Sequence, residues 1–453
     1  MAEVEALYTA ADMKAAEAGH DVAALMQRAG QAVATGALER FSDVHAITAV
    51  CGAGNNGGDT RIAARLLAGQ GKGVRIVEVK PEDEEKDLGE PDLVLDGIFG
   101  TGFSGEPRPG SARLIEQINA LPANVLAVDV PSGVDASTGE VASAAVRADV
   151  TATFHGLKVG LAVAPGRFHA GEVVVADIGL EPRETELRLV TPEILRRVPR
   201  RAPRDTKYTA GSVLVVGGSR GLTGAASLAA EAAFRADAGY VAVAAPAESL
   251  PVLEMRLLEA VKRPLEEVFA AAEKASALAL GPGLGRASEA QALVQRLLRE
   301  TDLPTVVDAD ALFELQPVDR DAPTVLTPHA GELGRLLDEE SAWVDAHRLE
   351  AAGRGAERFD AVCILKGADS IIAAPGEGAL VCSLGSSALA TAGSGDVLTG
   401  VVGAFLAKGL EARTAAAAAV AAQQVASTLV ANQTGMVASD VISALPRALD
   451  GPL

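Results

Sequence analysis

Gly52-Ala53-Gly54-Asn55-Asn56-Gly57-Gly58-Asp59 lies between an apolar run and an amphipathic run, which is the order of a strand, a turn and a helix. A second glycine-rich turn, Ala392-Gly393-Ser394-Gly395-Asp396, opens an apolar run in the other half of the chain. Glycines let backbone N–H groups crowd around an anion, as they do in phosphate-binding loops. Because a carboxylate repels phosphate, the aspartate that ends each loop predicts chemistry at a metal, a sugar hydroxyl or a proton. The two loops predict two nucleotide sites and favour two reactions on one polypeptide.

The composition indicates a large globular protein. The chain has 453 residues, of which 49% are hydrophobic and 3% aromatic, so its cores must consist mainly of Val, Leu, Ile and Ala. This length suits roughly two or three domains. The formal net charge of −20 argues against a general nucleic-acid or anionic-membrane binder, because both need a basic surface.

The cysteines and the first residues bear on location. Cys51, Cys363 and Cys382 lack metal-ligand spacing and are too few for a disulfide framework, which fits a reducing compartment. The acidic start of the sequence lacks the basic and apolar regions of a signal peptide. The alanine-rich stretch 414–431 is predicted to be a buried helix and not a membrane span, since it contains Gln423 and Gln424. We therefore expect a cytoplasmic protein with no membrane partner.

The first half alternates apolar runs with amphipathic segments. Helices are predicted over residues 11–34 and 61–68. This alternation predicts an α/β domain whose parallel sheet is covered on both faces. The predicted strands are 46–51, 74–79, 93–98, 125–130, 150–154 and 173–178.

Residues 181–206 interrupt this rhythm with charges and prolines and are predicted to be the interdomain linker. We therefore expect one domain over residues 1–195 and another over 205–453. The second domain repeats the alternation, with a hairpin at 371–374 and 379–383 and helices at 394–407 and 414–430. Its other predicted strands are 213–216, 241–245, 277–280, 305–307, 324–326 and 362–365.

The first glycine-rich loop admits a general interpretation. Gly52, Gly54 and Gly57 have the G-x-G-x-x-G spacing, and Glu78 lies where a ribose-binding acid would sit, so the loop could belong to a Rossmann NAD site. The polar side chains of Asn55–Asn56 and Asp59 argue against this, because a dinucleotide loop usually offers only backbone.

Further polar residues follow other strands of the first half. Asp96 and Asp129 each end an apolar run, and open α/β sheets bind ligands in the crevice at this edge. Asn56, Asp96 and Ser132 could converge as oxygen ligands of a cation, which would leave Asp129 to act on the substrate. Alternatively, these residues only cap turns, as Asp, Ser and Gly often do.

The second half places polar groups at one edge of its predicted sheet as well. The free N–H groups and dipole of the helix that starts near Ser394 would stabilise a transferring phosphoryl group. Asp396 would then be the general base that removes a proton from the attacking hydroxyl. As alternatives, Asp396 could simply cap the helix, and His329 could be an ordinary hydrogen-bonded polar residue.

In the first half, the runs GNNGGD (54–59), FGTGFSGEPR (99–108), VDVPSGVDASTGE (128–140) and TFHGLKVGL (153–161) together resemble the NAD(P)H-hydrate epimerase family. That family has a Rossmann-like fold and interconverts the R and S epimers of NADH and NADPH hydrated at C6 of the nicotinamide ring. The resemblance implies that Asp129 is the acid/base and that Asn56, Asp96 and Ser132 bind K⁺. The hydrate would be held by Asp129 together with Asn55, Asn56, Gly57, Gly58, Asp59, Gly100, Thr101, Gly102, Phe103, Ser104, Gly105 and Glu106.

In the second half, the runs LGPGLG (280–285), VVDADAL (306–312), LTPHAGEL (326–333), LKGADS (365–370) and TAGSGDVLTG (391–400) resemble the ADP/ATP-dependent NAD(P)H-hydrate dehydratases, which have a ribokinase-like fold. In that family ADP or ATP phosphorylates the C6 hydroxyl of the S-hydrate, and loss of phosphate regenerates NAD(P)H. Asp396 would be the base, and Mg²⁺ would neutralise the phosphates. The resemblance implies hydrate contacts from Ala225, Gly285, His329 and Asp396, and nucleotide contacts from Lys366, Gly367, Ala368, Asp369, Ser370 and Gly395.

The two resemblances predict a bifunctional nicotinamide-nucleotide repair enzyme that acts on NADHX and NADPHX with an adenine nucleotide. We also expect a homo-oligomer. One alternative is a small-molecule kinase fused to a dinucleotide-binding regulatory module. Another is a first half that serves only as a binding scaffold, as relatives in RNA metabolism do, although its carboxylates and the acidic net charge speak against this.

Overall fold

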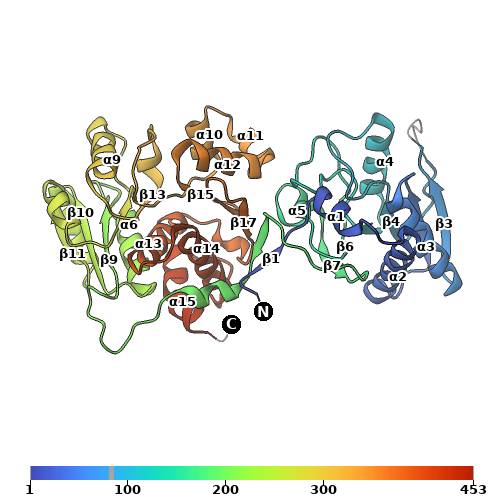
Figure 1. Ribbon diagram of the computed structural model, residues 1–453, viewed down its shortest axis with the longest axis horizontal. Helices are drawn as coiled ribbons and strands as arrows, with labels where there is room; N and C mark the ends of the chain where they lie inside the picture. Colours follow the sequence, from blue (N-terminus) through green and yellow to red (C-terminus); the bar gives the residue numbers. More distant parts are fainter. Residues whose placement is uncertain (1, 81–85, 452–453) are drawn as a thin grey trace. The chain divides into compact units, whose positions relative to one another are not determined.

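The computed structural model describes residues 2–80 and 86–451, which form two compact units. We call residues 6–187 the N-terminal unit, and residues 188–451 together with 2–5 the C-terminal unit. Both are α/β, as the sequence predicts (Figure 1). The boundary differs from the expected one, because residues 188–195 and the first residues of the chain belong with the C-terminal unit.

The sheet of the N-terminal unit has the order β3-β2-β4-β5-β6-β7, and its neighbouring strands are parallel. β3 lies at the edge of the sheet, outside β2, although it follows β2 in the sequence. This strand order is that of the flavodoxin-like doubly wound fold. Its direction of winding reverses between β2 and β4, where such sheets open a ligand crevice. The strands are β2 (Ala46–Cys51), β3 (Gly73–Glu78), β4 (Leu93–Gly97), β5 (Asn124–Val128), β6 (Val150–Phe154) and β7 (Glu172–Ala176).

Helices cover both faces of this sheet. α2 (Val22–Arg40) and α3 (Asn55–Gly69) pack on one face, whereas α4 (Pro109–Ala120) packs on the other through Ile115 and Ile118. The helix predicted over residues 11–34 is wrong as a single element. It is divided into α1 (Ala10–Glu17) and α2, because Gly19 has a φ of +85° and the Asp21 side chain caps the next helix.

The sheet of the C-terminal unit has the order β1-β8-β17-β16-β15-β14-β13-β12-β9-β10-β11. Strands β15 to β11 of this order are parallel, and β16 and β17 form the predicted antiparallel hairpin. The sequence missed the short strands β1, β8 and β11. The strands are β1 (Val4–Ala6), β8 (Arg188–Val190), β9 (Ser212–Val216), β10 (Tyr240–Ala245), β11 (Val261–Pro264), β12 (Ala277–Leu280), β13 (Thr305–Val307), β14 (Thr324–Leu326), β15 (Val362–Leu365), β16 (Ser370–Ala373) and β17 (Ala379–Cys382).

Two layers of helices enclose this second sheet. One core contains apolar side chains of α6 (Thr223–Arg235), α13 (Ser394–Ala407), α14 (Ala412–Thr428) and α15 (Ala438–Asp450). The other contains those of α8 (Val268–Ala272), α9 (Ser288–Glu300) and α10 (Ala330–Leu337). This unit also contains the helices α7 (Leu250–Arg256), α11 (Ser341–Ala346) and α12 (Arg348–Phe359). Within the described residues, none of the helices combines the length and apolarity needed to cross a membrane.

The segment predicted to be a linker is partly structural. Between its charged residues lie four apolar ones that are buried in the same core as residues of α14 and α15. These are Val190, Ile194, Leu195 and Val198. Three arginines of the same segment form ion pairs with acidic residues elsewhere in the C-terminal unit. These pairs are Arg197 with Glu3, Arg200 with Asp450 and Arg201 with Asp237.

This packing predicts a stability effect that a solvated linker would not give. Leu195→Ala should lower the free energy of unfolding by about 2–5 kcal/mol, because it removes a fully buried side chain from the core. The control Arg204→Ala, at an exposed position of the same segment, should change it by less than about 0.5 kcal/mol. Urea unfolding of the full chain measures both. Equal values for the two variants would contradict the docking of this segment.

Candidate active sites

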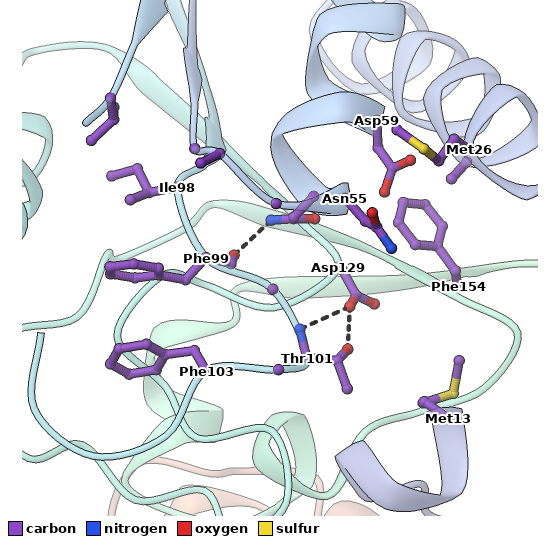
Figure 2. A pocket seen from close by; sticks show the side chains of 18 of the residues that line it. Met13, Met26, Asn55, Asp59, Ile98, Phe99, Thr101, Phe103, Asp129 and Phe154 are labelled. Atoms are coloured by element: carbon purple, nitrogen blue, oxygen red, sulfur yellow. Dashed lines mark hydrogen bonds between the residues drawn. The ribbon is translucent and has the colours of Figure 1, made fainter. Parts of the chain in front are cut away.

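A pocket of about 650 Å³ opens at the carboxyl end of the N-terminal sheet, where the winding reverses (Figure 2). Most residues predicted to hold the hydrate line it, whereas Gly57, Gly58, Ser104 and Gly105 are absent from its lining. Phe99 and Phe103 stack with ring centroids 4.5 Å apart and give one wall an aromatic surface. The predicted residues that line the pocket are Asn55, Asn56, Asp59, Gly100, Thr101, Gly102, Phe103, Glu106 and Asp129.

The glycines of the first loop are required by close approaches of the backbone. A Cβ at Gly52 would lie 2.0 Å from the Ile98 carbonyl oxygen, and one at Gly57 would lie 1.9 Å from the Gly52 carbonyl oxygen. Helix α3 starts within this loop, at Asn55 with Gly54 as its N-cap, so its first N–H groups are available for an anion at the pocket.

Asp129 follows β5 directly and is held in an unusual backbone conformation, with φ of 66°. Such strain in a residue other than glycine is typical of functional sites. Its carboxylate lies 2.7 Å from the Lys158 ammonium and accepts hydrogen bonds from Thr101 and from the Thr153 hydroxyl. Burial alone would raise the pKa of Asp129, but the nearby Lys158 ammonium and these hydrogen bonds outweigh it and keep that pKa below its usual value.

Lys158 is a residue that the sequence reasoning missed. Its side chain is fully buried, and its ammonium donates to the Thr153 hydroxyl and the Phe154 carbonyl while it pairs with Asp129. A lysine four residues after β6 gives no local signal of this contact, since Asp129 follows the neighbouring strand β5.

Asp59 also lines this pocket, but in a different electrostatic setting. Its Oδ1 atom is buried and has no hydrogen-bond partner among the described residues. Burial, followed by the charges of Asp129 and Glu17, raises the pKa of Asp59 to about 8. The site therefore contains one carboxyl group that favours the ionised form and one that favours the protonated form at neutral pH.

The predicted cation ligands lie together beneath the pocket. The Asn56 amide donates to the Phe99 carbonyl, and the Ser132 hydroxyl lies 3.4 Å from that carbonyl oxygen and 2.6 Å from Asp96. Asp96 is fully buried, and its pKa is raised to about 6 by burial, which outweighs hydrogen bonds from Ser132 and Ile98. Asn56 Oδ1 is buried without a hydrogen-bond partner in the described part of the chain. This set of oxygens fits a monovalent cation.

The arrangement at Glu78 bears on the alternative of a dinucleotide site. Arg61 donates to both carboxylate oxygens of Glu78 and to the Gly52 carbonyl. This pairing lowers the pKa of Glu78, chiefly through the hydrogen bond from Arg61. The acid that would bind a ribose in a Rossmann NAD site is thus already engaged by a neighbouring helix.

The second candidate site of the chain lies in the C-terminal unit, at the carboxyl ends of β13, β14 and β15. The Lys366 ammonium lies 2.8 Å from Asp308 and 3.7 Å from Glu332, and the Thr399 hydroxyl donates to Asp308 at 2.6 Å. A Cβ on Gly395 would lie 3.4 Å from this ammonium, so α13 begins directly beside it. Asp308 occurs in a motif visible in the sequence, but its role as the partner of Lys366 was not predicted.

Asp396 occupies the first turn of α13 and is half-buried. Burial, followed by the charge of Asp308, raises the pKa of Asp396 to about 7, although Lys366 opposes the shift. A carboxyl group with a pKa near neutrality suits a general base.

The other predicted hydrate contacts are distributed around this edge. Gly285, with φ of 86°, donates its N–H to Asp310, and Ala225 lies in the first turn of α6. The His329 ring accepts from the N–H groups of Gly331 and Glu332 at the start of α10. His329 therefore has the local hydrogen bonds of an ordinary capping residue, while 57% of its side chain is exposed.

The predicted nucleotide loop 366–370 is anchored from behind by Arg348 of α12. Its guanidinium pairs with the buried Asp369 and donates to the carbonyls of Lys366 and Asp369. The Asp369 and Ser370 side chains are buried, and a Cβ on Gly367 would meet Arg348 at 2.3 Å. Arg348, which the sequence reasoning also missed, thus fixes the conformation of this loop.

The fold and the two sites define an α/β protein with separate ligand sites that both contain acid/base groups. Residues 213–447 match the family described as NAD(P)H-hydrate dehydratase, and residues 22–89 and 73–160 match that of the YjeF-related protein N-terminus. The chain belongs to the bifunctional NAD(P)H-hydrate repair enzymes. Such enzymes from Salinibacter ruber and Moorella thermoacetica are 36% and 37% identical to it, over 93% and 94% of this chain and 91% and 92% of their own.

Solved structures agree with the fold of the C-terminal unit. An ADP/ATP-dependent NAD(P)H-hydrate dehydratase from Bacillus subtilis, co-crystallised with ATP/Mg²⁺, has a TM-score of 0.53 and 29% identity. The similarity extends over 57% of this chain and 96% of the Bacillus subtilis chain. A ribokinase-like superfamily protein from Enterococcus faecalis, at 23% identity and a TM-score of 0.53, supports the same fold over 59% of this chain and 97% of its own. The predicted ribokinase-like fold is confirmed.

The buried pair of the N-terminal site predicts a coupled effect on stability. At neutral pH, Lys158→Met should cost about 3–5 kcal/mol, because it leaves the Asp129 carboxylate buried without its cation. The double variant Lys158→Met/Asp129→Asn should recover much of this loss. Because the folded pKa of Asp129 is lowered, the pair stabilises above the ordinary carboxyl pKa and is lost as pH falls through the folded value. Denaturant unfolding tests this, and a single-variant cost below about 1 kcal/mol would contradict it.

Proposed function

We propose that the N-terminal unit epimerises R- and S-NAD(P)H hydrate and that the C-terminal unit dehydrates the S form at the expense of ADP or ATP. The observation that carries this proposal is the strained, ion-paired Asp129 in a pocket at the sheet edge, combined with family membership. The pairing is chemically coherent, because one site consumes only the S epimer and the other supplies S from R. Association of several copies and a cytoplasmic location stay predictions.

In the N-terminal site, Asp129 is the acid/base. Its lowered pKa keeps it ionised at neutral pH and ready to accept a proton, and Lys158 and Thr153 hold its orientation. Asn55, Gly100, Thr101, Gly102, Phe103 and Glu106 line the space that the hydrate would occupy. Gly57, Gly58, Ser104 and Gly105 would support this lining without facing the pocket.

Asn56, Asp96 and Ser132 would hold K⁺. The orphan Asn56 Oδ1 and the buried Asp96 carboxyl group, which has hydrogen bonds but no cationic partner among the described contacts, support this assignment. When bound, the ion would supply positive charge that fixes the loops around it. None of these oxygens is required for proton transfer, which we assign to the pocket carboxyl groups.

In the C-terminal site, Asp396 is the base that takes the proton of the C6 hydroxyl as this oxygen attacks the terminal phosphoryl group. Lys366 and the N–H groups that start α13 lie where they can stabilise the transferred charge. The nucleotide would lie along residues 366–370 and Gly395, and Asp369 can contribute only through its backbone, since Arg348 occupies its side chain.

Mg²⁺ would accompany the nucleotide and supply charge neutralisation for the phosphates. The residues fit such a complex, because Asp308 and Asp310 add to the negative charge around Asp396 and raise its pKa. Ala225, Gly285 and His329 would contact the hydrate from the neighbouring strand ends.

The two halves should fail separately. With a mixture of R- and S-NADH hydrate and excess ADP, the wild-type chain should restore the full near-ultraviolet absorbance of NADH. Asp129→Ala should stop at the S fraction, and Asp396→Ala should give no NADH, with losses of at least about 100-fold in the affected step. If the wild-type chain restored no absorbance, a kinase with a regulatory module would be favoured. Unchanged use of the R epimer by Asp129→Ala would refute the role of Asp129.

The dehydratase step should depend on pH near neutrality. Because Asp396 must be ionised to act as a base and its pKa is about 7, the rate should fall about tenfold per pH unit below that value. Epimerisation by the same chain is an internal control, since the pKa of Asp129 is below its usual range and should leave this rate unchanged there. A dehydration rate that stays constant across this range would contradict the assignment of Asp396.

A further inference from the structure

The Asp59 carboxyl group is placed inside the N-terminal pocket without a partner that would explain its burial. Only 7% of the residue is exposed, and its Oδ1 is buried with no hydrogen-bond partner among the residues that the structure describes. Asp129, in the same pocket, has the Lys158 ammonium, the Thr153 hydroxyl and the N–H and hydroxyl of Thr101 as partners, and Figure 2 shows the two hydrogen bonds from Thr101. Leaving a buried polar atom unpaired destabilises the fold, so a functional role is the natural explanation.

The packing of α3 against α2 holds Asp59 at this position. A Cβ at Gly58 would lie 1.9 Å from the Met26 methyl group, and one at Gly30 would lie 2.8 Å from the Asp59 carbonyl oxygen. The two helices are therefore in contact at Gly58 and at Asp59, which fixes the backbone here. Asp59 lines the pocket, so its carboxyl group faces the space that the ligand would enter.

We infer that Asp59 is the proton donor of the N-terminal site and acts together with Asp129, the proton acceptor. This inference rests on the proposed epimerase function and gives Asp59 a role beyond contact with the hydrate. Proton transfer in two directions within one site needs two groups in opposite protonation states. The raised pKa of Asp59 and the lowered pKa of Asp129 provide these states at neutral pH.

The other charged groups around this pocket come from four segments. Glu17 ends α1, and its own pKa is raised by burial and then by Asp129. Lys158 faces Asp129 from behind. Lys80 follows β3, and Glu106 and Arg108 precede α4 at the pocket lining. The charges that act most strongly on Asp59, those of Asp129 and Glu17, are negative, and they favour its protonated form.

The substrate chemistry supplies a balanced step for this pair. C6 of the hydrate carries a hydroxyl group and is bonded to ring N1, so it can open to an aldehyde. Asp129 takes the hydroxyl proton as the C6–N1 bond breaks, the electron pair of that bond goes to N1, and Asp59 gives its proton to N1. After rotation about C5–C6, N1 attacks the other face of the aldehyde and returns its proton to Asp59. Asp129 then returns its proton to the oxygen, so the step needs no further reactant.

The test compares Asp59→Asn with the wild-type chain in conversion of purified R-NADH hydrate to the S epimer, followed by chromatography after subtraction of the spontaneous rate. The wild-type rate should fall as pH rises above about 8, where Asp59 loses its proton. Asp59→Asn should lower kcat at least about 100-fold, change KM less than about threefold and remove this alkaline decline. Asp43→Asn, on the surface outside the pocket, is the matched control and should behave as wild type.

Dehydration of S-NADH hydrate with ADP by the same variant reports on an intact chain, and the thermal unfolding midpoint reports on the N-terminal unit. A kcat within about threefold of wild type, or an alkaline decline that persists in Asp59→Asn, would overturn the inference while the proposed function stands. A wild-type rate that does not decline above about pH 8 would overturn it as well, even if the variant failed to fold. Absence of any wild-type epimerisation would instead refute the proposed function, and this inference with it.

Discussion

A lysine held against a buried aspartate that follows a parallel strand organises each unit. Lys158 and Asp129 form this pair in the N-terminal unit, and Lys366 and Asp308 form it in the C-terminal unit. Burying one such charge alone is costly, so each aspartate, its lysine and the loops that carry them must assemble together. Each pair lies at the sheet edge where the candidate site of its unit forms, and other polar groups of the site lie around it.

The two pairs serve different purposes. Asp129 is itself the reacting group that we propose, and Lys158 keeps it ionised. Asp308 is fully occupied by Lys366 and Thr399, and its negative charge instead raises the pKa of Asp396 at the start of α13. The same kind of contact therefore favours an ionised carboxyl group in one unit and raises the pKa of a neighbouring carboxyl group toward neutrality in the other.

The sequence was sufficient for most of the fold, because parallel strands of Val, Ile and Ala alternate with helices and their ends carry Gly and Asp. It missed β1, β8 and β11, which are short and contain charged residues whose apolar neighbours are few. It located Asp59 in its loop but not its protonation, which depends on Asp129 and Glu17 from other segments. Lys158 and Arg348 were missed for the same reason, since their partners lie on other elements of the fold.

The first residues of the chain have a topological consequence. Glu3 and Ala2 accept hydrogen bonds from Thr191, so the chain begins in the C-terminal unit, leaves it near residue 6 and returns near residue 187. Where it leaves and returns, Leu7 and Leu187 are joined by a backbone hydrogen bond of 2.9 Å. The N-terminal unit is thus an insertion between the first strand of the other unit and the rest of it. During synthesis, that first strand must wait until the inserted unit has emerged from the ribosome, so completion of one enzyme half requires prior synthesis of the other.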